Sequence, residues 1–344
     1  MSSFKIATVI PCLNEKEYIL NCLDSLIDQT FDNSKHLIWI LDGGSTDGTI
    51  EIIENYIQNL EQNQSPRIEL HHNEKKFVPH ARNYALKELP DSIEFIVEMI
   101  AHCTVPNDHY EKREEAWNRC NSVLEKKGKR LAALGVRVLP AEGNMTVQEG
   151  WIESCLSSRF GGGSGQFANF SKEEKTKVPA FVTHDRSALQ AVDGWSERFE
   201  TSQDSDLSMR LLSNNFELMR TPSTHVNMRK RNNLANWWKM SVRYGFWRTK
   251  ILMQYPSRAS LREFLPLFGI LITIFLAIWF KSFVSIPLIA YGIVLTLVGI
   301  NSVFYSKKIS SIFGTPLCMI ILHTGFSLGL IQGLIKKGKV AKDR

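Results

Sequence analysis

The chain has 344 residues, of which 44% are hydrophobic and 22% are charged, and this composition excludes collagen-like, low-complexity and disordered chains. The formal net charge is +6, and the excess of Lys and Arg is concentrated at 229–262 and 336–344, beside long apolar runs. Basic residues in such places suit anionic lipid headgroups, whereas a nucleic-acid-binding protein would need them throughout the folded part.

The first 140 residues alternate short apolar runs with segments of helical periodicity. Strands are expected at 6–10, 37–41, 67–70, 95–100 and 131–139, and helices at 18–27, 49–60, 80–89 and 109–124. This rhythm predicts an α/β fold with a mostly parallel, Rossmann-like sheet and helices on both faces. A ligand of such a sheet lies beyond the carboxyl ends of the strands, where residues 11–15, 42–49 and 100–104 fall.

The region from 140 to 262 is less regular. Residues 159–165 contain four glycines and are expected to form a loop, and helices are expected at 206–212 and 237–253. The six cysteines lie at no metal-binding spacing, and no secretory signal peptide opens the sequence. They are therefore expected to be reduced and buried in a cytosolic domain.

Three uncharged stretches, 264–280, 283–305 and 309–335, close the chain. They contain about 17, 23 and 27 residues, against the roughly 20 that a helix needs to cross a bilayer. This pattern predicts membrane insertion, and a buried helical core is the alternative. A channel or transporter is disfavoured, because the stretches contain no acid and base pair of the kind that marks an ion path.

The topology of these stretches stays open. If all three cross and the first domain is cytosolic, the basic tail that begins at Lys336 lands outside, against the positive-inside rule. The short gap Lys281-Ser282 suggests a tight hairpin. One stretch could therefore be re-entrant or lie in the interface, which would keep both ends of the chain cytosolic.

Polar motifs follow the first three expected strands. Residues 42–49, Asp-Gly-Gly-Ser-Thr-Asp-Gly-Thr, end a buried strand and open a helix. The acids there could accept hydrogen bonds from a nucleobase and a ribose, while the glycines admit the ligand to the backbone. Alternatively the segment is only a turn in which Asp47 caps the helix. Residues 9–15, Val-Ile-Pro-Cys-Leu-Asn-Glu, and 81–86, Ala-Arg-Asn-Tyr-Ala-Leu, are the other two motifs.

Together the three motifs closely resemble those of family 2 glycosyltransferases of GT-A fold, and within them the membrane-anchored succinoglycan-biosynthesis type. The resemblance covers nearly the whole chain. It implies that the nucleotide-sugar donor is bound by six residues: Pro11, Asn14, Glu15, Asp42, Asp47 and Arg82. Residues 203–207, Gln-Asp-Ser-Asp-Leu, match the family's Glu-Asp-x-Glu/Asp-Leu motif, which makes Asp204 the general base.

Three further residues are matched less strictly. Arg231 and Arg243 fall at basic positions of the segment that leads into the membrane, and they are candidates for binding the diphosphate or the acceptor. Guanidinium groups bind phosphate through paired hydrogen bonds, although attraction to lipid headgroups explains these residues equally well. His184 falls where the acceptor should approach, and a simple loop histidine is the alternative.

The metal motif departs from the family. There an Asp-x-Asp or Asp-Ala-His at the end of the fourth strand holds Mg2+ or Mn2+, but here Ile100 replaces the leading acid and cannot bind a hard cation. His102 remains a weak candidate ligand, and Glu98 could substitute, although its depth in the sheet argues against this. The metal cofactor that the resemblance implies is therefore in doubt, and Met240 departs from the family's Gln-x-x-Arg motif.

The resulting hypothesis is an inverting glycosyltransferase at the cytoplasmic face of the cell membrane. It would move a sugar from a nucleotide sugar to a lipid-linked or polysaccharide acceptor, with no nucleic acid partner. The expected organisation is a catalytic GT-A domain at 1–230, a basic amphipathic segment at 231–262, transmembrane helices at 263–336 and a basic tail at 337–344. The alternative is a degenerate family member that binds a nucleotide or a partner protein without turnover.

Overall fold

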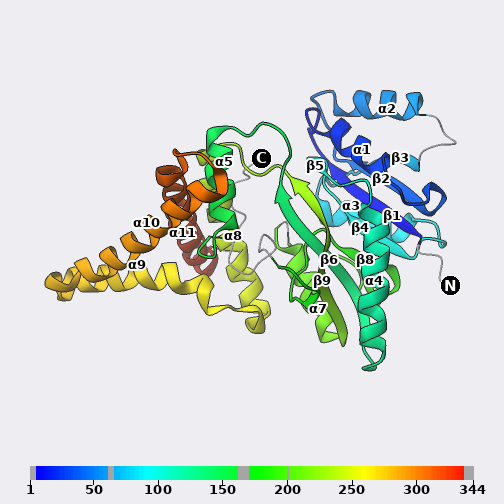
Figure 1. The fold of residues 1–344 in the computed structure, drawn as a ribbon. Coiled ribbons are helices and arrows are strands. Elements are labelled where there is room, and N and C mark those ends of the chain that lie inside the picture. Colours follow the sequence, from blue (N-terminus) through cyan, green and yellow to red (C-terminus); the bar gives the residue numbers. More distant parts are fainter. Residues whose placement is uncertain (1–4, 61–65, 162–169, 200, 337–344) are drawn as a thin grey trace. The chain divides into compact units, whose positions relative to one another are not determined.

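The computed structural model describes residues 5–60, 66–161, 170–199 and 201–336 (Figure 1). The chain divides into two compact units, Met1–Glu142 with Asn169–Arg229, and Gly143–Ala168 with Lys230–Arg344. Residues 143–168, which the sequence pattern placed with the catalytic domain, thus belong to the carboxy-terminal unit. The basic tail at 337–344 and glycines 162, 163 and 165 of the expected loop lie outside the described residues.

A mixed β-sheet forms the centre of the amino-terminal unit. Its strands are β1 (Ile6–Cys12), β2 (His36–Asp42), β3 (Arg67–His72), β4 (Phe95–Glu98), β5 (Cys103–Thr104), β6 (Arg130–Pro140), β7 (Glu174–Lys175), β8 (Thr183–Asp185) and β9 (Phe216–Met228). The order is β3-β2-β1-β4-β8-β6-β9-β5, and β7 pairs with β9. The first four strands are parallel, and β8 runs antiparallel between β4 and β6. All five expected strands are present.

Helices cover both faces of this sheet. They are α1 (Ile19–Ile27), α2 (Thr49–Asn59), α3 (Val78–Glu88), α4 (His109–Glu125), α6 (Arg186–Gln190) and α7 (Gln203–Ser213). Because side chains alternate along a strand, Ile10 and Ile38 pack on the face covered by α1, α2 and α4, while Val9 and Trp39 pack on the face covered by α3, α6 and α7. The α/β fold expected from the sequence is confirmed.

The longest strand, β9, was not predicted. It contains Pro222, and a proline within a run normally argues against a paired strand. The structure accommodates this proline at a register shift, where Thr221 and His225 oppose the neighbouring residues Val136 and Arg137 of β6. The intervening residues bulge from the ladder, and the proline therefore removes no hydrogen bond from it.

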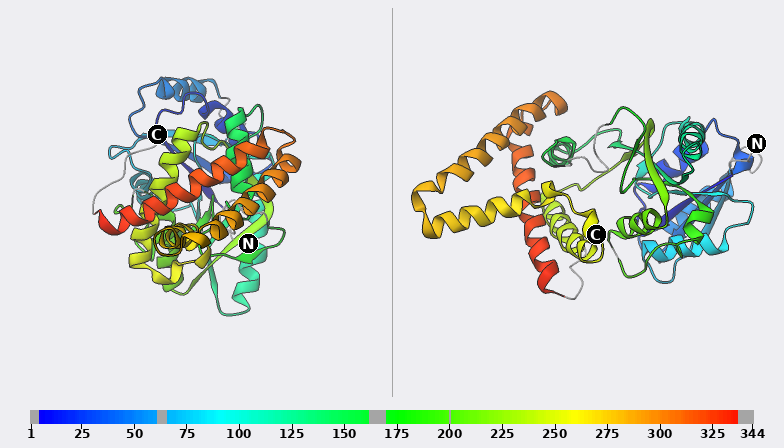
Figure 2. Two further views of the ribbon diagram at one scale, coloured as in Figure 1. Left: turned by 90° about the vertical axis from the view of Figure 1, so that its left-hand side faces the viewer. Right: turned by 90° about the horizontal axis from the view of Figure 1, so that it is seen from below.

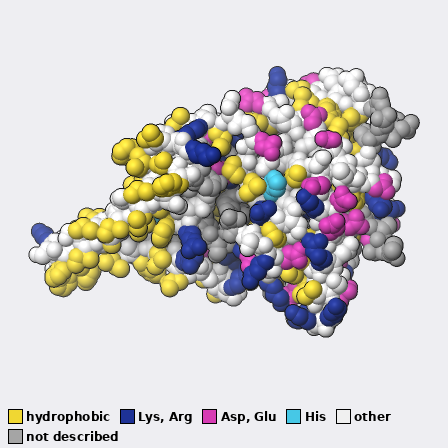
Figure 3. Space-filling model, in the orientation of Figure 1, with side chains coloured by type: hydrophobic (Ala, Val, Ile, Leu, Met, Phe, Trp, Pro, Cys, Tyr) yellow, Lys and Arg dark blue, Asp and Glu magenta, His cyan; other side chains and the backbone are white. Residues whose placement is uncertain are grey.

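The carboxy-terminal unit is helical. It consists of α5 (Val147–Ser157), α8 (Leu234–Gln254), α9 (Leu261–Trp279), α10 (Ser285–Ser306) and α11 (Ser311–Ile335). Among the described residues, α9, the segment Lys281–Phe304 and α11 are long and apolar enough to cross a membrane. Figure 3 shows the apolar side chains of α9 and α10 at the surface, and Trp279 and Phe304 are 70% and 78% exposed. A lipid environment would bury this surface.

Small residues bring α8 and α11 into close contact. Ser241, Gly245 and Thr249 of α8 face a stripe of glycines on α11 at 325, 329 and 333. A Cβ atom added to Gly329 would lie 2.1 Å from the carbonyl oxygen of Val242, and one added to Gly245 would lie 2.1 Å from that of Phe326. Such stripes allow helix backbones to approach closely, and van der Waals packing then holds the pair together.

We expect Gly329→Ala to lower the stability of the helical unit by about 1–3 kcal/mol, because the added methyl group overpacks this contact. Gly292→Ala on α10 is the matched control, since nothing lies within 4 Å of its added Cβ and alanine favours a helix. Thermal unfolding of the full chain in detergent measures both. Equal melting temperatures for the two variants would contradict the packing described.

Candidate functional site

The carboxylate of Asp42 is fixed at the end of β2. Its Oδ1 accepts hydrogen bonds from the backbone N–H groups of Gly44 at 2.7 Å and Ser45 at 2.8 Å, and its Oδ2 accepts one from the Ser45 hydroxyl at 2.5 Å. Gly44 adopts a φ of 83°, a left-handed conformation that glycine tolerates best. The turn therefore presents a rigid, 2% exposed carboxylate at the carboxyl edge of the sheet.

The first two sequence motifs interlock at this edge. The Asn14 N–H donates to the Ser45 hydroxyl at 2.8 Å, and the Thr46 N–H donates to Asn14 Oδ1 at 2.9 Å. The Glu15 N–H donates to Thr49 Oγ1 at 3.0 Å. Asn14 has a φ of 55°, which asparagine adopts more readily than most residues. Two loops 30 residues apart in sequence thus form one surface beyond β1 and β2. Pro11 lies in β1 opposite Leu41 and is half-buried.

Asp47 lies one residue before Gly48, the N-cap of α2, and forms a turn with the first residue of that helix. Its Oδ1 accepts from the backbone N–H of Thr49 at 3.1 Å and from the Thr49 hydroxyl at 2.5 Å, at the start of α2. Its Oδ2 accepts from the Lys16 N–H at 3.2 Å. Slight desolvation raises the pKa of Asp47, but these hydrogen bonds outweigh it and lower the pKa overall. The N-cap of α2 is Gly48, so the alternative in which Asp47 caps the helix is wrong. Asp47 closes the turn that leads into α2, and its contact with the donor stays a prediction.

A buried charge cluster, here called the Glu98 cluster, consists of Arg82, Glu98, His184 and Trp195. Oε1 of Glu98 lies 3.2 Å from Arg82 Nη1, 3.1 Å from His184 Nε2 and 3.2 Å from Trp195 Nε1. All four residues are less than 10% exposed. Burial alone would raise the pKa of Glu98, but the Arg82 charge and the hydrogen bonds from His184 and Trp195 lower it to about 2. The cluster therefore carries an ionised carboxylate inside the protein.

This cluster changes the interpretation of two predicted site residues. His184 lies on β8 with 3% exposure, so the alternative of a simple loop histidine is wrong. Arg82 begins the second turn of α3 and is committed to Glu98 through Nη1, with its guanidinium carbon 5.7 Å from the centre of the Trp195 ring. The sequence offered Glu98 as a substitute metal ligand, but in the structure its carboxylate pairs with Arg82.

A second polar group joins the ends of β1 and β4. Nδ1 of His102 lies 2.9 Å from Oε1 of Glu15, and the Tyr18 ring packs edge-on against the imidazole. The Arg229 guanidinium lies 5.8 Å from the centre of the Tyr18 ring. The backbone N–H of Arg229 donates to the His102 carbonyl at 3.3 Å. Glu15, His102 and Arg229, which are far apart in sequence, thus meet beyond the same strand ends as the loop of Asp42.

These residues do not reproduce the family's metal motif. Ile100 packs against the hydrophobic core, and Glu98 belongs to the buried cluster. Within the described ranges, no group of three or more His, Cys, Asp or Glu side chains is placed to hold a metal ion. Glu15 and His102 together offer a cation one carboxylate and one imidazole, whereas a hard cation such as Mg2+ prefers oxygen ligands.

The predicted base, Asp204, lies in the first turn of α7. It is half-buried, and its Oδ1 accepts from the Ser205 N–H at 2.8 Å. Asp206, two residues on, is 1% exposed and pairs with Arg210 at 2.8 Å. Arg210 also donates to the Gly194 carbonyl at 2.7 Å, which ties α7 to the preceding segment. The two acids of this motif therefore have different environments: Asp206 is structural and Asp204 reaches the surface.

The segment before α7 is fastened to the edge that carries Asp42. The Asn73 N–H, just after β3, donates to the Asp42 carbonyl at 2.7 Å. Lys75 Nζ lies 3.0 Å from Glu197 Oε2. The Asn83 side-chain amide donates to the Trp195 carbonyl at 2.7 Å and accepts from the Trp195 N–H at 2.7 Å. The Lys75 ion pair and the two Asn83 hydrogen bonds thus hold residues 195–197 beside the loop after β3 and helix α3, and α7 follows from there.

Arg231 and Arg243 belong to the other compact unit. Arg243 is half-buried on α8, with its guanidinium 5.6 Å from the Tyr244 ring. Their roles toward the diphosphate or the acceptor stay predictions. All six cysteines are buried and free, as expected.

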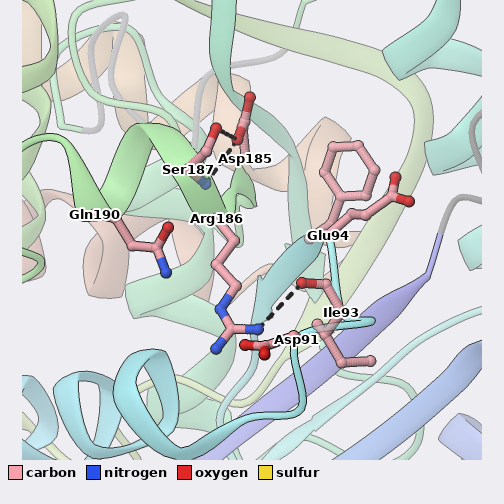
Figure 4. Close-up of a pocket in the computed structure, with 8 residues that line it drawn as sticks. Asp91, Ile93, Glu94, Asp185, Arg186, Ser187 and Gln190 are labelled. Carbon is pink, nitrogen blue, oxygen red and sulfur yellow. Dashed lines mark hydrogen bonds between the residues drawn. The ribbon is translucent and has the colours of Figure 1, made fainter.

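A cavity of about 380 Å3 lies at the opposite edge of the sheet (Figure 4). It is lined by Phe95, which pairs with Ile6 at the start of β1, and by Asp185 and Arg186. Arg186 donates to the carbonyl of Ile93 at 3.3 Å and to that of Leu89 at 2.7 Å. This arginine therefore satisfies carbonyl groups at and beyond the end of α3, which is a structural role.

Comparisons with known proteins point to glycosyltransferases. Residues 8–124 match the family model described as Glycosyl transferase family 2. The chain is 27% identical over 273 residues to the succinoglycan biosynthesis protein ExoA of Rhizobium meliloti. This alignment covers 78% of this chain and 76% of that protein. It is 23% identical over 339 residues to a dolichyl N-acetyl-alpha-D-glucosaminyl phosphate 3-beta-D-2,3-diacetamido-2,3-dideoxy-beta-D-glucuronosyltransferase of Methanococcus voltae, with 98% and 99% coverage.

A solved structure shares the fold. The mannosyltransferase PcManGT from Pyrobaculum calidifontis, determined in complex with GDP-Man and Mn2+, superposes with a TM-score of 0.62 at 13% identity, over 97% of this chain and 88% of that one. The loops after β1 and β2 and helix α3 all fall inside the matched range 8–124. Residues 8–124 therefore carry a family 2 glycosyltransferase domain on a GT-A-like fold, which supports glycosyltransferase activity.

Proposed function

We propose that this protein transfers a sugar, with inversion at C1, from a nucleotide sugar to a lipid-linked or polysaccharide acceptor at the cytoplasmic face of a membrane. The observation that carries the proposal is the interlocked edge beyond β1 and β2, where the Asp42 carboxylate is held rigidly and the segment leading to Asp204 is fastened nearby. A ligand of a parallel sheet binds at this edge.

The donor would lie across the loops after β1 and β2. Asp42 would accept a hydrogen bond from the nucleobase, and Asn14 and Glu15 would complete the wall of the site with Pro11. Gly44 adopts a positive φ and is only partly buried, so it leaves backbone open to a ligand there, as close approach of a nucleotide requires. The solved relative with bound GDP-Man supports a nucleotide sugar as the donor class.

Asp204 would act as the general base. Its carboxylate would take the proton of an acceptor hydroxyl, whose oxygen forms the new bond to C1 of the sugar while the bond from C1 to the diphosphate oxygen breaks on the opposite face. The nucleotide diphosphate leaves with the electron pair of that bond. Its developing charge needs cationic neighbours, for which we propose Arg229, Arg231 and Arg243.

The acceptor class follows from the apolar helices and from the relatives. A catalytic unit joined to helices that can cross a membrane is suited to an acceptor anchored in lipid. The archaeal relative is named for a dolichyl-linked substrate and the bacterial one for succinoglycan biosynthesis. A degenerate protein that only binds a nucleotide is the second candidate, favoured by Ile100 and Met240.

Turnover by the purified full chain distinguishes these two functions. A panel of nucleotide sugars is incubated with the protein and a membrane lipid extract, and release of the nucleotide diphosphate is measured. Donor consumption that depends on the extract supports transfer to a lipid-linked acceptor. Thermal stabilisation by a nucleotide without any turnover would support the binding protein.

We expect EDTA to leave at least half of this turnover, because Ile100 replaces the carboxylate through which the family's motif would hold the cation. The assay is run with 5 mM EDTA, on the order of a thousandfold above trace metal, and again with added Mn2+. Complete loss in EDTA with recovery in Mn2+ would show that the family's metal is retained despite Ile100.

A further inference from the structure

Helices α8 and α11 run parallel to one another. The Trp237 indole N–H donates to the Cys318 carbonyl at 2.8 Å near one end of the pair. Near the other end the Lys250 ammonium donates to the carbonyls of Gly333 at 2.7 Å and Lys336 at 2.8 Å. Residue numbers rise together along both helices, so the carboxyl end of α11 lies at the carboxyl end of α8.

The same end of α8 holds the beginning of α9. Arg248 lies 3.2 Å from Glu263, the third residue of α9, and Arg258 in the connecting segment lies 3.5 Å from the same carboxylate. The beginning of α9 and the carboxyl end of α11 are therefore neighbours, because both are fastened to the last turns of α8.

The opposite end of α11 adjoins the end of α10. Only residues 307–310 separate these two helices, and the Ser302 hydroxyl donates to the Ser311 carbonyl at 2.9 Å. A Cβ added to Gly299 would lie 2.5 Å from the Ile312 carbonyl oxygen, so the two backbones are in close contact there. The amino end of α11 thus lies at the carboxyl end of α10. Helix α11 therefore extends from the end of α10 to the beginning of α9.

Helices α9 and α10 form a hairpin whose two arms diverge from the turn Lys281–Phe283 (Figure 2). At 1.5 Å per residue their 19 and 22 residues extend about 28 Å and about 33 Å, close to the roughly 30 Å of a hydrocarbon core. When both helices of a hairpin enter a bilayer from one side, the beginning of the first and the end of the second stay on that side.

From these contacts we infer that α11 does not cross the membrane. Its two ends lie at the beginning of α9 and at the end of α10, which are on one side of the bilayer. Only the α9–α10 hairpin is inserted, and α8 with α11 forms a two-helix layer on the membrane surface. This inference rests on the proposed membrane attachment and is independent of the proposed sugar transfer.

The charge distribution agrees with this arrangement. If α11 crossed, α8 beside it would carry Lys239, Arg243, Arg248 and Lys250 into the hydrocarbon, where cations are costly. With α11 on the surface, these residues stay in the polar layer near anionic headgroups, where cations are favoured. The tip of the hairpin carries only Lys281, whereas Arg258, Arg262, Lys307 and Lys308 flank its base, as the positive-inside rule requires.

Cysteine labelling tests which side each end of α11 occupies. Lys308→Cys and Lys336→Cys replace exposed lysines just before and just after α11. Full-length protein carrying either substitution is treated with a membrane-impermeant maleimide in sealed right-side-out and inverted vesicles. The unsubstituted protein, whose six cysteines are buried, gives the background, and labelling after detergent gives the full signal.

We expect both cysteines to react in the same vesicle orientation, each at five times background or more, and neither to react in the other. Reaction of the two cysteines in opposite orientations would overturn the inference. The same measurement on protein carrying Asp204→Asn separates topology from function, since labelling does not depend on turnover. A surface-bound α11 with no turnover would refute the proposed transfer and leave this inference standing.

Discussion

Asp204→Asn is expected to reduce kcat by about 10^2 to 10^4-fold while leaving the donor KM within about threefold. The amide keeps the shape of the side chain but cannot take a proton, and a positioned general base contributes a factor of this size. Because Asp204 is half-buried in the first turn of α7, its substitution should change stability by less than about 0.5 kcal/mol. Release of nucleotide diphosphate under saturating donor measures kcat, and thermal unfolding measures stability.

Asp206→Asn is the matched control, two residues away in the same motif. Asp206 is 1% exposed and holds Arg210, so this substitution should lower the melting temperature. Its remaining folded fraction should keep a kcat within about tenfold of the original. The two variants should therefore fail in different assays. If Asp204→Asn retained more than a tenth of the original kcat with full stability, Asp204 would not be the base.

The sequence predicted the α/β architecture because its signals are local. Apolar runs such as 6–10 and 37–41 are buried on both faces of the sheet, and a short buried run has few other ways to satisfy its backbone. Helices α5 and α6 and strand β8 were missed, because α5 has little helical amphipathicity and the other two are short. Their positions depend on partners far along the chain.

The Glu98 cluster shows why the site could be predicted only in part. Residues 9–15, 42–49 and 81–86 could be recognised because each motif is continuous in sequence. The side chains of Glu98, His184 and Trp195 come from three separate segments, and the antiparallel pairing of β8 with β4 brings them together. A strand-end glutamate among apolar neighbours was the available signal, since a buried carboxylate requires a partner.

Substitution of Glu98 by alanine is expected to lower the free energy of unfolding of the amino-terminal unit by about 3–5 kcal/mol. It would leave the buried Arg82 guanidinium without its counter-charge, which costs more than the pair itself contributes. Glu98→Gln should cost less, about 2 kcal/mol, because its amide oxygen can still accept hydrogen bonds from Arg82 and Trp195 although it carries no charge. Glu88→Ala on α3 is the control, since that side chain is 43% exposed and pairs with the exposed Lys87.

The pH dependence of the same variant distinguishes loss of a charge from loss of packing. The folded pKa of Glu98 lies at about 2, below its ordinary value of 4.5. A lowered pKa contributes stability that is complete above the unfolded value and is lost as pH falls toward the folded one. The stability gap between the original chain and Glu98→Ala should therefore be constant from pH 7 to about pH 5 and shrink between pH 4.5 and pH 2. Urea unfolding of the full chain in detergent measures this gap, and a gap that stays constant to pH 3 would mean that packing, rather than the ionised carboxylate, holds Arg82 and His184 in place.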